Sequence, residues 1–405
     1  MLKKDIKIMI TGGGSGGHLS VVKGLIDALI QDYNIPIQNI VYVGGDLGME
    51  GEKKGNSLEQ KQFKDAKFKT YYIRAGKLQR KLSLNTISLL FRSILGFFDS
   101  LSIVKKEKPT IIISSGGFIS VPVCTAGHIF HKPIFLHEQT ASVGLSNKIV
   151  GKFSKKIYVS FKESIKYFPK GKTIHTGNIV RKEIFNSKAT KDTDKEIVTL
   201  MVTNKQLPFI YISGGSLGSH SINTKVLESL NDLLRKYRVL LQTGDNETFK
   251  DYEKAVQLKE NLIDEYKERL VIKKYIDGKS IGYVLNGMDI FTGRAGANTV
   301  YEIGVLKKFA LFIPIPWATH NEQYLNAKVL SDIGTANILE EKYLKDCNLT
   351  EEIERFSNQV KLRKIDYKKL EALFPTNATY KILDDIFKSL DIWSICYIIK
   401  VYEGI

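Results

Sequence analysis

The stretch TGGGSGGH, Thr11 to His18, follows a short apolar run, Ile6 to Ile10, and precedes apolar residues at helical spacing from Val22 to Ile30. Glycines placed between a strand and a helix let the backbone turn sharply and approach a ligand. The free amides at the start of the helix then face an anion, which the helix dipole favours. The loop predicts a phosphate site, with a structural turn as the alternative. It completes neither a Walker loop nor a dinucleotide-binding fingerprint.

The same pattern recurs in the second half of the chain. The strand-like run Phe209 to Ile212 leads into SGGSLGS, Ser213 to Ser219, where Ser216 adds a hydroxyl donor. Two separate loops of this kind are a more specific signal than one. They predict two phosphate-bearing ligands, or one ligand that bridges two domains.

Strand-like and helix-like segments alternate around both loops, as in parallel sheets covered by helices. The polar segment Ser187 to Glu196 predicts a solvated loop near a domain junction. The sequence therefore predicts an α/β protein with two Rossmann-like doubly wound domains, residues 1–180 and 181–375. Residues 376–405 are expected to form a helix that returns to the first domain, followed by an apolar tail.

A third motif, GRAGANTVYE, runs from Gly293 to Glu302 after the strand-like Asp289 to Phe291. Its residues Thr299 to Glu302 resemble a first helical turn, so another helix start is offered to an anion. The Glu302 carboxylate is suited to accept hydrogen bonds from the vicinal hydroxyls of a ribose. The alternative is an ordinary first-turn acid that the helix dipole favours.

Two residues are candidate bases. His18 closes the first glycine loop at a helix start, where the dipole disfavours an imidazolium, and a neutral imidazole can accept a proton near pH 7. Capping or packing is the alternative for His18. Glu138, in the polar block His137-Glu138-Gln139, is the rival base, with a structural hydrogen bond as its alternative.

The composition bounds the classes of protein that are possible. The 405 residues are 43% hydrophobic, enough for a sizeable core, and the net charge is +17. That charge fits a polyanion partner, namely nucleic acid, anionic lipid or phosphate-bearing substrates, or reflects an A/T-rich genome. The three cysteines form no CxxC pair, so no zinc site is expected. Met1 to Thr11 predicts a strand rather than a signal peptide, and no apolar run reaches the roughly 20 residues of a membrane span.

With these motifs in place, the sequence resembles the MurG family of peptidoglycan synthesis, from about Ile6 to about Leu390. Seven blocks in the family's order carry the resemblance: Gly12 to His18, Ser114 to Phe118, His137 to Gln139, Gly177 to Arg181, Gly214 to Gly218, Arg294 to Glu302 and Asn321 to Ala327.

The resemblance implies the GT-B arrangement, with an interdomain cleft between an acceptor domain and a donor domain. It implies an inverting glycosyltransferase that moves N-acetylglucosamine from UDP-N-acetylglucosamine to the 4-hydroxyl of an undecaprenyl-diphosphate-linked muramyl pentapeptide. Neither a cofactor nor an obligatory metal is expected, because helix amides and Ser216 can stabilise the leaving diphosphate.

The resemblance also assigns positions to the site. His18 and Glu138 are the catalytic candidates, and Leu217 stands where the family usually has Gln. The substrate-binding positions are Ser15, Gly16 and Gly17 on the donor side of the cleft, Arg181 and Ser216 on the donor, Ile276 near the uracil, Ala297, Asn298, Thr299, Val300 and Tyr301 at the diphosphate, Glu302 on the ribose, Gln323 on the sugar hydroxyls, and Thr140, where the family usually has Asn.

A lipid-linked acceptor predicts a peripheral protein on the cytoplasmic face of the bacterial inner membrane, bound to its anionic surface. Ile73 to Phe98 mixes apolar and basic residues, and its part Lys77 to Leu84 is the favoured contact. A buried core helix is the alternative for Leu89 to Phe98.

Two other functions also fit the sequence. One is a UDP-N-acetylglucosamine 2-epimerase, which shares the fold and the donor. The other is a non-enzymatic polyanion-binding protein, suggested by charge alone, although nothing resembles a module that reads nucleic acid.

Overall fold

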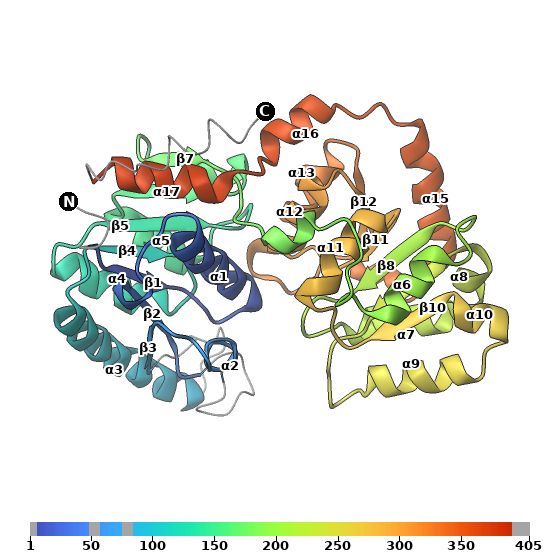
Figure 1. Ribbon diagram of the computed structural model, residues 1–405, viewed down its shortest axis with the longest axis horizontal. Coiled ribbons are helices and arrows are strands. Elements are labelled where there is room, and N and C mark those ends of the chain that lie inside the picture. The colour runs from blue at the N-terminus through green and yellow to red at the C-terminus, as the bar shows by residue number, and fades with distance from the viewer. Residues whose placement is uncertain (1–5, 48–56, 75–83, 391–405) are drawn as a thin grey trace. The chain divides into compact units, whose positions relative to one another are not determined.

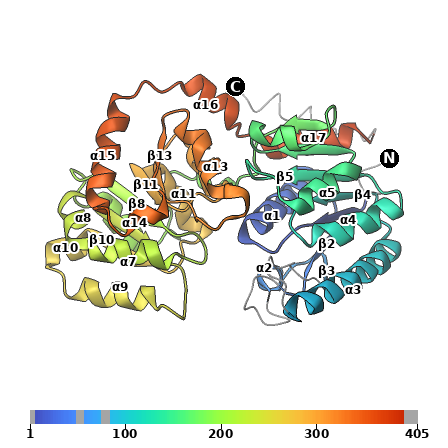
Figure 2. The ribbon, with the colours of Figure 1, turned by 180° about the vertical axis from the view of Figure 1, so that it is seen from behind.

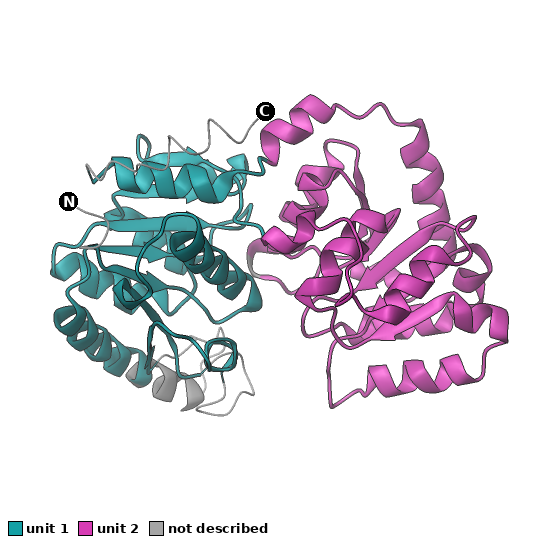
Figure 3. Cartoon of the chain, viewed as in Figure 1, with its two compact units in different colours: residues 1–180, 375–405 teal, residues 181–374 magenta. Residues whose placement is uncertain are grey.

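The computed structural model describes residues 6–47, 57–74 and 84–390. For residues 84–91 and 319 it describes the backbone only. The chain divides into two compact units (Figure 3). Unit 1 comprises Met1–Val180 and Pro375–Ile405, and unit 2 comprises Arg181–Phe374. No helix of the described residues has both the length and the apolar character needed to cross a membrane.

Unit 1 is built on a parallel sheet with the strand order β3-β2-β1-β4-β5-β6-β7 in its described residues. The strands are β1 (Ile8–Thr11), β2 (Ile40–Gly45), β3 (Lys69–Ile73), β4 (Ile111–Ser114), β5 (Ile134–Glu138), β6 (Lys156–Val159) and β7 (Thr173–His175). The helices are α1 (Gly16–Gln31), α2 (Leu58–Gln62), α3 (Leu84–Glu107), α4 (Ser120–Ile129), α5 (Leu145–Phe153) and α17 (Ala378–Lys388), with short 3₁₀ turns at Ile37–Asn39 and Lys162–Tyr167.

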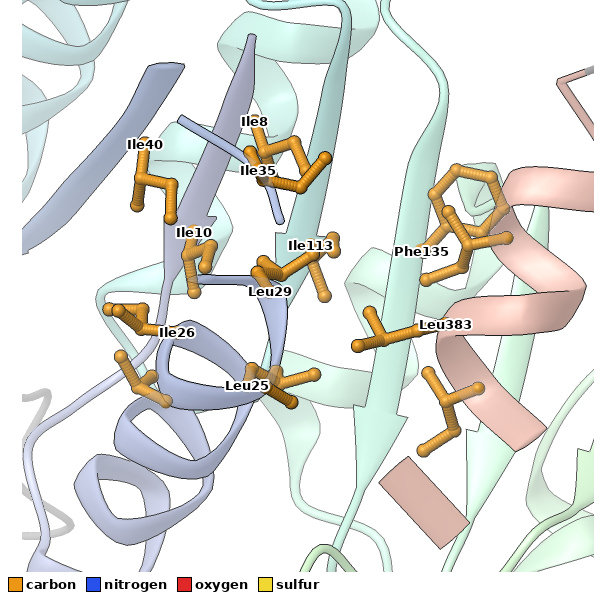
Figure 4. Packing of buried hydrophobic residues seen from close by; sticks show 14 of the residues in the cluster. Ile8, Ile10, Leu25, Ile26, Leu29, Ile35, Ile40, Ile113, Phe135 and Leu383 are labelled. Atoms are coloured by element: carbon orange, nitrogen blue, oxygen red, sulfur yellow. The ribbon is translucent and has the colours of Figure 1, made fainter. Parts of the chain in front are cut away.

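Side chains that alternate along β1 fill two separate cores on the two faces of this sheet. Ile8 and Ile10 pack with Leu25 of α1 and Leu383 of α17 (Figure 4). Met9 belongs to the opposite core, with residues of α3, α4 and α5. Figure 1 and Figure 2 show the ribbon of these helices from two sides. Nearly continuous apolar strands such as 111–113 are thus explained by burial on both faces.

The helix α17 returns to unit 1 after the chain has built unit 2, and polar contacts hold it there. The Tyr33 hydroxyl donates to Asp384 at 2.6 Å, and Asp385 accepts from Lys156 at 2.7 Å and from Tyr158 at 2.8 Å. Apolar contacts alone are not directional, so these hydrogen bonds fix the position of α17 along the sheet.

Unit 2 repeats the architecture with the parallel order β10-β9-β8-β11-β12-β13 in its described residues. The strands are β8 (Phe209–Ser213), β9 (Arg238–Gln242), β10 (Leu270–Lys273), β11 (Ile290–Gly293), β12 (Phe309–Phe312) and β13 (Ala336–Ile338). The helices are α6 (Lys195–Val202), α7 (His220–Glu228), α8 (Leu230–Lys236), α9 (Asp251–Glu260), α10 (Asp264–Glu268), α11 (Gly278–Gly287), α12 (Ala297–Val305), α13 (Glu322–Ser331), α14 (Glu341–Leu344), α15 (Leu349–Leu362) and α16 (Tyr367–Leu373), with 3₁₀ turns at Lys182–Phe185 and Thr319–Asn321.

The predicted fold class is confirmed, since both units are doubly wound parallel sheets with helices on their faces. Some local predictions were wrong. Asp194 caps the start of α6, so Glu196 lies in a helix rather than in the predicted loop. The helix α12 begins at Ala297, two residues earlier than predicted, and has no acid in its first turn. The first-turn explanation of Glu302 is therefore wrong.

The predicted membrane segment is described only in part. Residues 75–83, which carry most of the favoured contact Lys77 to Leu84, lie outside the described residues. Within α3 the side chains of Ile94 and Phe98 are 49% and 59% exposed. The part of Leu89 to Phe98 that carries these two residues is therefore not a wholly buried core helix.

Candidate active site

The two glycine loops lie at equivalent places in the two sheets. In each unit the strand that precedes the glycine loop, β1 or β8, lies beside β4 or β11, where the strand order changes direction. Parallel strands end at a common edge, and ligands of doubly wound sheets bind at this topological switch point. The topology therefore brings the loop after β4 to the first glycine loop, and the loop after β11 to the second.

The first glycine loop is packed too closely for side chains. A Cβ on Gly12 would lie 1.9 Å from the Ser115 hydroxyl, and one on Gly117 would lie 2.3 Å from the Gly13 carbonyl. The helix α1 begins at Gly16 with Ser15 as its N-cap, and Ser15 makes no side-chain capping bond. The Gly14 amide, however, donates to the buried Glu59 carboxylate at 2.5 Å. This amide is therefore not offered to an anion, which corrects the expectation for that part of the loop.

His18 is the third residue of α1, and neutral groups surround its imidazole. Its Nδ1 lies 2.7 Å from the Ser115 carbonyl oxygen and 2.9 Å from Nε2 of Gln139. A carbonyl oxygen only accepts, so Nδ1 carries the proton and Nε2 keeps its lone pair. Burial lowers the pKa of His18 below its ordinary value of 6.5, partly offset by the bond to Ser115. The direction is as predicted, but burial is the cause rather than the helix dipole.

Glu138, the rival base, ends β5 and is 2% exposed. One carboxylate oxygen accepts from the Thr140 amide at 2.9 Å and hydroxyl at 2.8 Å, and the other accepts from Asn147 at 2.8 Å. Burial raises the pKa of Glu138, against the lowering effect of these bonds. The structural interpretation fits this geometry, with Thr140 as a partner of Glu138.

In unit 2 the second glycine loop and the start of α12 face the same edge of the sheet. Ser216 is exposed at the loop, and Leu217 is 54% exposed. The N-caps of α7 and α12, Ser219 and Gly296, make no side-chain capping bonds. By contrast, Asp277 caps α11 through its carboxylate, directly after the half-buried Ile276. The helices at the two motifs thus begin without the side-chain acceptor that occupies the start of α11.

Arg181 and Glu302, both predicted to bind the donor, hold each other. The guanidinium donates twice to the carboxylate, from Nε at 2.9 Å and from Nη2 at 3.0 Å. Burial acts to lower the pKa of Arg181, but Glu302 is the main cause of a net rise. Each carboxylate oxygen has a second lone pair. Glu302, with 8% of its side chain exposed, is thus oriented by Arg181 and can still accept from hydroxyls.

Arg294, in the third motif, is held by three groups of unit 2. Its guanidinium donates to the Ile313 carbonyl at 3.0 Å, to Glu341 at 2.6 Å and to the Ser219 hydroxyl at 2.6 Å. Arg294 thereby joins the loop after β11 to the N-cap of α7 and to α14. Glu341 was not predicted, because nothing local distinguishes it from other surface acids.

Gln323 lies in the first turn of α13, after two residues in the left-handed region, His320 with φ 53° and Asn321 with φ 52°. Such strain in non-glycine residues is concentrated at functional sites. The Gln323 Oε1 accepts from the Ala295 and Ile315 amides, each at 3.2 Å. The amide orientation is therefore fixed, and Nε2 is the group that Gln323 presents as a donor.

Comparison with known proteins follows the same division of the chain. The family model described as the glycosyltransferase family 28 N-terminal domain matches residues 8–159, and that of the family 28 C-terminal domain matches residues 209–373.

Two curated relatives illustrate the likeness in sequence, and both carry the name UDP-N-acetylglucosamine–N-acetylmuramyl-(pentapeptide) pyrophosphoryl-undecaprenol N-acetylglucosamine transferase. The protein from Clostridium novyi is 33% identical over 352 residues, 86% of this chain and 89% of its own length. One from Bacillus anthracis, numbered 2, is 34% identical over 364 residues, 90% of this chain and 95% of its own.

Solved structures resemble the chain in fold. MurG from Acinetobacter baumannii matches with a TM-score of 0.67 at 22% identity, over 95% of this chain and 99% of its own. A protein from Listeria monocytogenes described as a putative UDP-N-acetylglucosamine 2-epimerase matches with a TM-score of 0.61 at 13% identity, over 95% of this chain and 97% of its own. At these identities the likeness concerns the fold alone.

Proposed function

The chain belongs to glycosyltransferase family 28 and, within it, to the MurG family, and from this premise we propose how it transfers a sugar. The reaction moves N-acetylglucosamine from UDP-N-acetylglucosamine to a muramyl pentapeptide carried on undecaprenyl diphosphate, in peptidoglycan synthesis. One observation carries this conclusion: identity of 33–34% over 86–90% of the chain to proteins named for that activity.

The donor is proposed to bind unit 2 through contacts of three kinds. The diphosphate lies at the starts of α12 and α7, where Ser216 adds a donor and residues 297–301 supply the helix turn. Glu302, held by Arg181, accepts from the ribose hydroxyls, and Gln323 donates to the sugar through Nε2. Ile276 contacts the uracil.

The transfer itself is proposed to be a single displacement with inversion. The acceptor 4-hydroxyl oxygen attacks the anomeric carbon, the bond from that carbon to the β-phosphate oxygen breaks, and the electron pair leaves with UDP. Nε2 of His18 takes the hydroxyl proton and returns it to solvent. The geometry favours His18 over Glu138, because Glu138 is 2% exposed and its carboxylate is held by hydrogen bonds from Thr140 and Asn147.

A lipid-linked acceptor requires contact with a membrane, so we propose that unit 1 binds an anionic surface peripherally, at the cytoplasmic face of the inner membrane. The exposed Ile94 and Phe98 of α3 support a contact that includes this helix. The favoured loop Lys77 to Leu84 remains a prediction from the sequence, as does the interdomain cleft.

Incubation of the full chain with UDP-N-acetylglucosamine and the lipid-linked muramyl acceptor tests the function. We expect UDP release that requires the acceptor, together with a lipid product that has gained one N-acetylglucosamine. UDP release or sugar epimerisation without any acceptor would favour the 2-epimerase alternative, which the likeness at 13% identity supports in fold alone.

A further inference from the structure

We propose that Gln139 is a positioning residue that holds the Ser115 carbonyl on Nδ1 of His18, so that Nε2 is always the proton acceptor. The inference rests on the proposed role of His18 as base and names the group that sets its tautomer. Gln139 is 3% exposed, and its side-chain nitrogen lies against Nδ1 of His18 and the Ser115 carbonyl. Its proposed effect on the reaction therefore passes through His18.

The sheet brings these three residues together from different strands. β1, β4 and β5 are neighbours, and their carboxyl ends lead into the first glycine loop, Ser115 and Gln139 respectively. His18 therefore meets groups 97 and 121 residues away in the sequence. Gly117 permits this approach, since a Cβ there would lie 3.3 Å from Cδ2 of the His18 ring.

The distances decide which nitrogen carries the proton. If Nδ1 had no proton, its lone pair would face the Ser115 oxygen at 2.7 Å, with two acceptors in contact. The amide of Gln139, 2.9 Å from Nδ1, would then donate to the ring and favour this wrong tautomer. The same amide nitrogen also donates to the Ser115 oxygen at 3.0 Å, so with the proton on Nδ1 both nitrogens donate to one carbonyl oxygen, which has two lone pairs. That bond orients the carbonyl and keeps the amide engaged there.

Other titratable groups face this corner of the site. His137 of β5 interacts with His18, but burial lowers the pKa of His137 to about 4. Glu138 precedes Gln139, and Glu59 of α2 bonds the Gly14 amide. The pH dependence of kcat/KM is therefore also measured for Glu138→Gln. We expect this variant to keep the pH at which kcat/KM falls on the acid side.

The test compares pH profiles of kcat/KM for wild type, Gln139→Leu and Gln139→Glu in the full chain. Gln139→Leu removes the donor to Ser115, so kcat should fall about 10-fold to 100-fold through misorientation, while the KM for the donor stays unchanged. Gln139→Glu places a carboxylate beside Nδ1–H, which favours the imidazolium. The acid limb should therefore move up by about one pH unit.

Activity of Gln139→Glu should recover on the alkaline side of its shifted limb, which a merely structural role of Gln139 does not predict. Gln257→Glu, which adds the same charge at an exposed position of α9, is the matched control and should move nothing. An unshifted limb in Gln139→Glu would overturn the inference about Gln139.

A separate readout does not depend on turnover. ¹⁵N NMR of the histidine rings, assigned by difference with His18→Gln, should show His18 with its proton on Nδ1 in the wild type. A proton on Nε2 would overturn the inference. If His18→Gln keeps near-normal turnover, the proposed base fails instead, and the ring spectrum still reports on Gln139 independently.

Discussion

The two glycine loops each lead into a helix with a histidine at its start, and their electrostatic surroundings differ. His18 contacts a carbonyl and an amide. His220, the first residue of α7, donates from Nδ1 to the Asp251 carboxylate at 2.8 Å and stacks on Phe249 with ring centroids 3.9 Å apart. The same local motif therefore places a histidine with neutral partners, His18, in unit 1 and a histidine paired with a carboxylate, His220, in unit 2.

The contrast extends to the rest of the two sites. In unit 1 the polar partners around Glu138 are neutral, namely Thr140 and Asn147. In unit 2 the corresponding edge is organised by the ion pairs Arg181–Glu302 and Arg294–Glu341. We infer that unit 1 handles the proton and that unit 2 binds the charged donor.

The largest expected effect is on His18. His18→Gln should lower kcat by about 10²–10⁴ while the affinity for UDP-N-acetylglucosamine stays unchanged, because only proton transfer is lost. Steady-state kinetics and donor titration measure the two quantities. His220→Gln, at the equivalent place in unit 2, should change kcat by only a few-fold. Similar losses of kcat in both variants would break the comparison.

The next effect concerns the buried ion pair between Arg294 and Glu341 in unit 2. Glu341→Gln removes the charged partner of a guanidinium whose side chain is only 7% exposed. Unfolding free energy should fall by about 3 kcal/mol, at the low end for a broken buried pair, since Ser219 and Ile313 still accept from Arg294. Denaturant unfolding measures this loss. Glu354→Gln, in an exposed pair with Lys236, should stay within about 0.5 kcal/mol of wild type.

Glu302→Ala should weaken donor binding by about 10-fold to 100-fold, from the loss of charge-assisted bonds worth about 1.5–3 kcal/mol. Calorimetric titration with UDP measures this change, and the KM for the acceptor should not move. Glu371→Ala removes a carboxylate that is 59% exposed in unit 2 and serves as the control. Unchanged affinity in Glu302→Ala would remove this residue from the donor site.

The smallest expected effect is at the membrane. Phe98→Ser should reduce binding to anionic vesicles by about 1 kcal/mol, close to five-fold, because partial burial of the ring in lipid is lost. Co-sedimentation at two salt concentrations measures it. Leu362→Ser removes an apolar side chain that is 88% exposed in unit 2 and should have no effect. Equal losses in both variants would contradict a membrane contact specific to unit 1.

The sequence was sufficient for the fold because its signals are local. Apolar runs that end in glycines marked β1 and β8, and both strands lie in the interior of their sheets. The three motifs fell at the switch points for the same reason. The start of α12 was misplaced by two residues, because Ala297 and Asn298 carry no strong helix-start signal of their own.

Contacts between distant residues could not be predicted in this way. Glu59 bonds a glycine 45 residues earlier, and Arg294 bonds Glu341, 47 residues later. No periodicity links such pairs, so the direction of the Arg294 side chain and the role of Gln139 emerge only from the folded sheet. The pairing of Arg181 with Glu302 is similar, since each was predicted separately as a donor contact.

The most direct test of the division between the units is the pH dependence of two quantities in the same full chain, kcat and the affinity for UDP-N-acetylglucosamine. The diphosphate diester of this donor does not titrate near neutral pH. Measurements should stay above pH 5, because His137, with a pKa of about 4, stabilises the fold less as pH falls below 6.5. We predict that kcat falls on the acid side, through a limb below 6.5 that belongs to His18, while donor affinity stays constant. A donor affinity that falls along the same limb, or a kcat without that limb, would contradict the account.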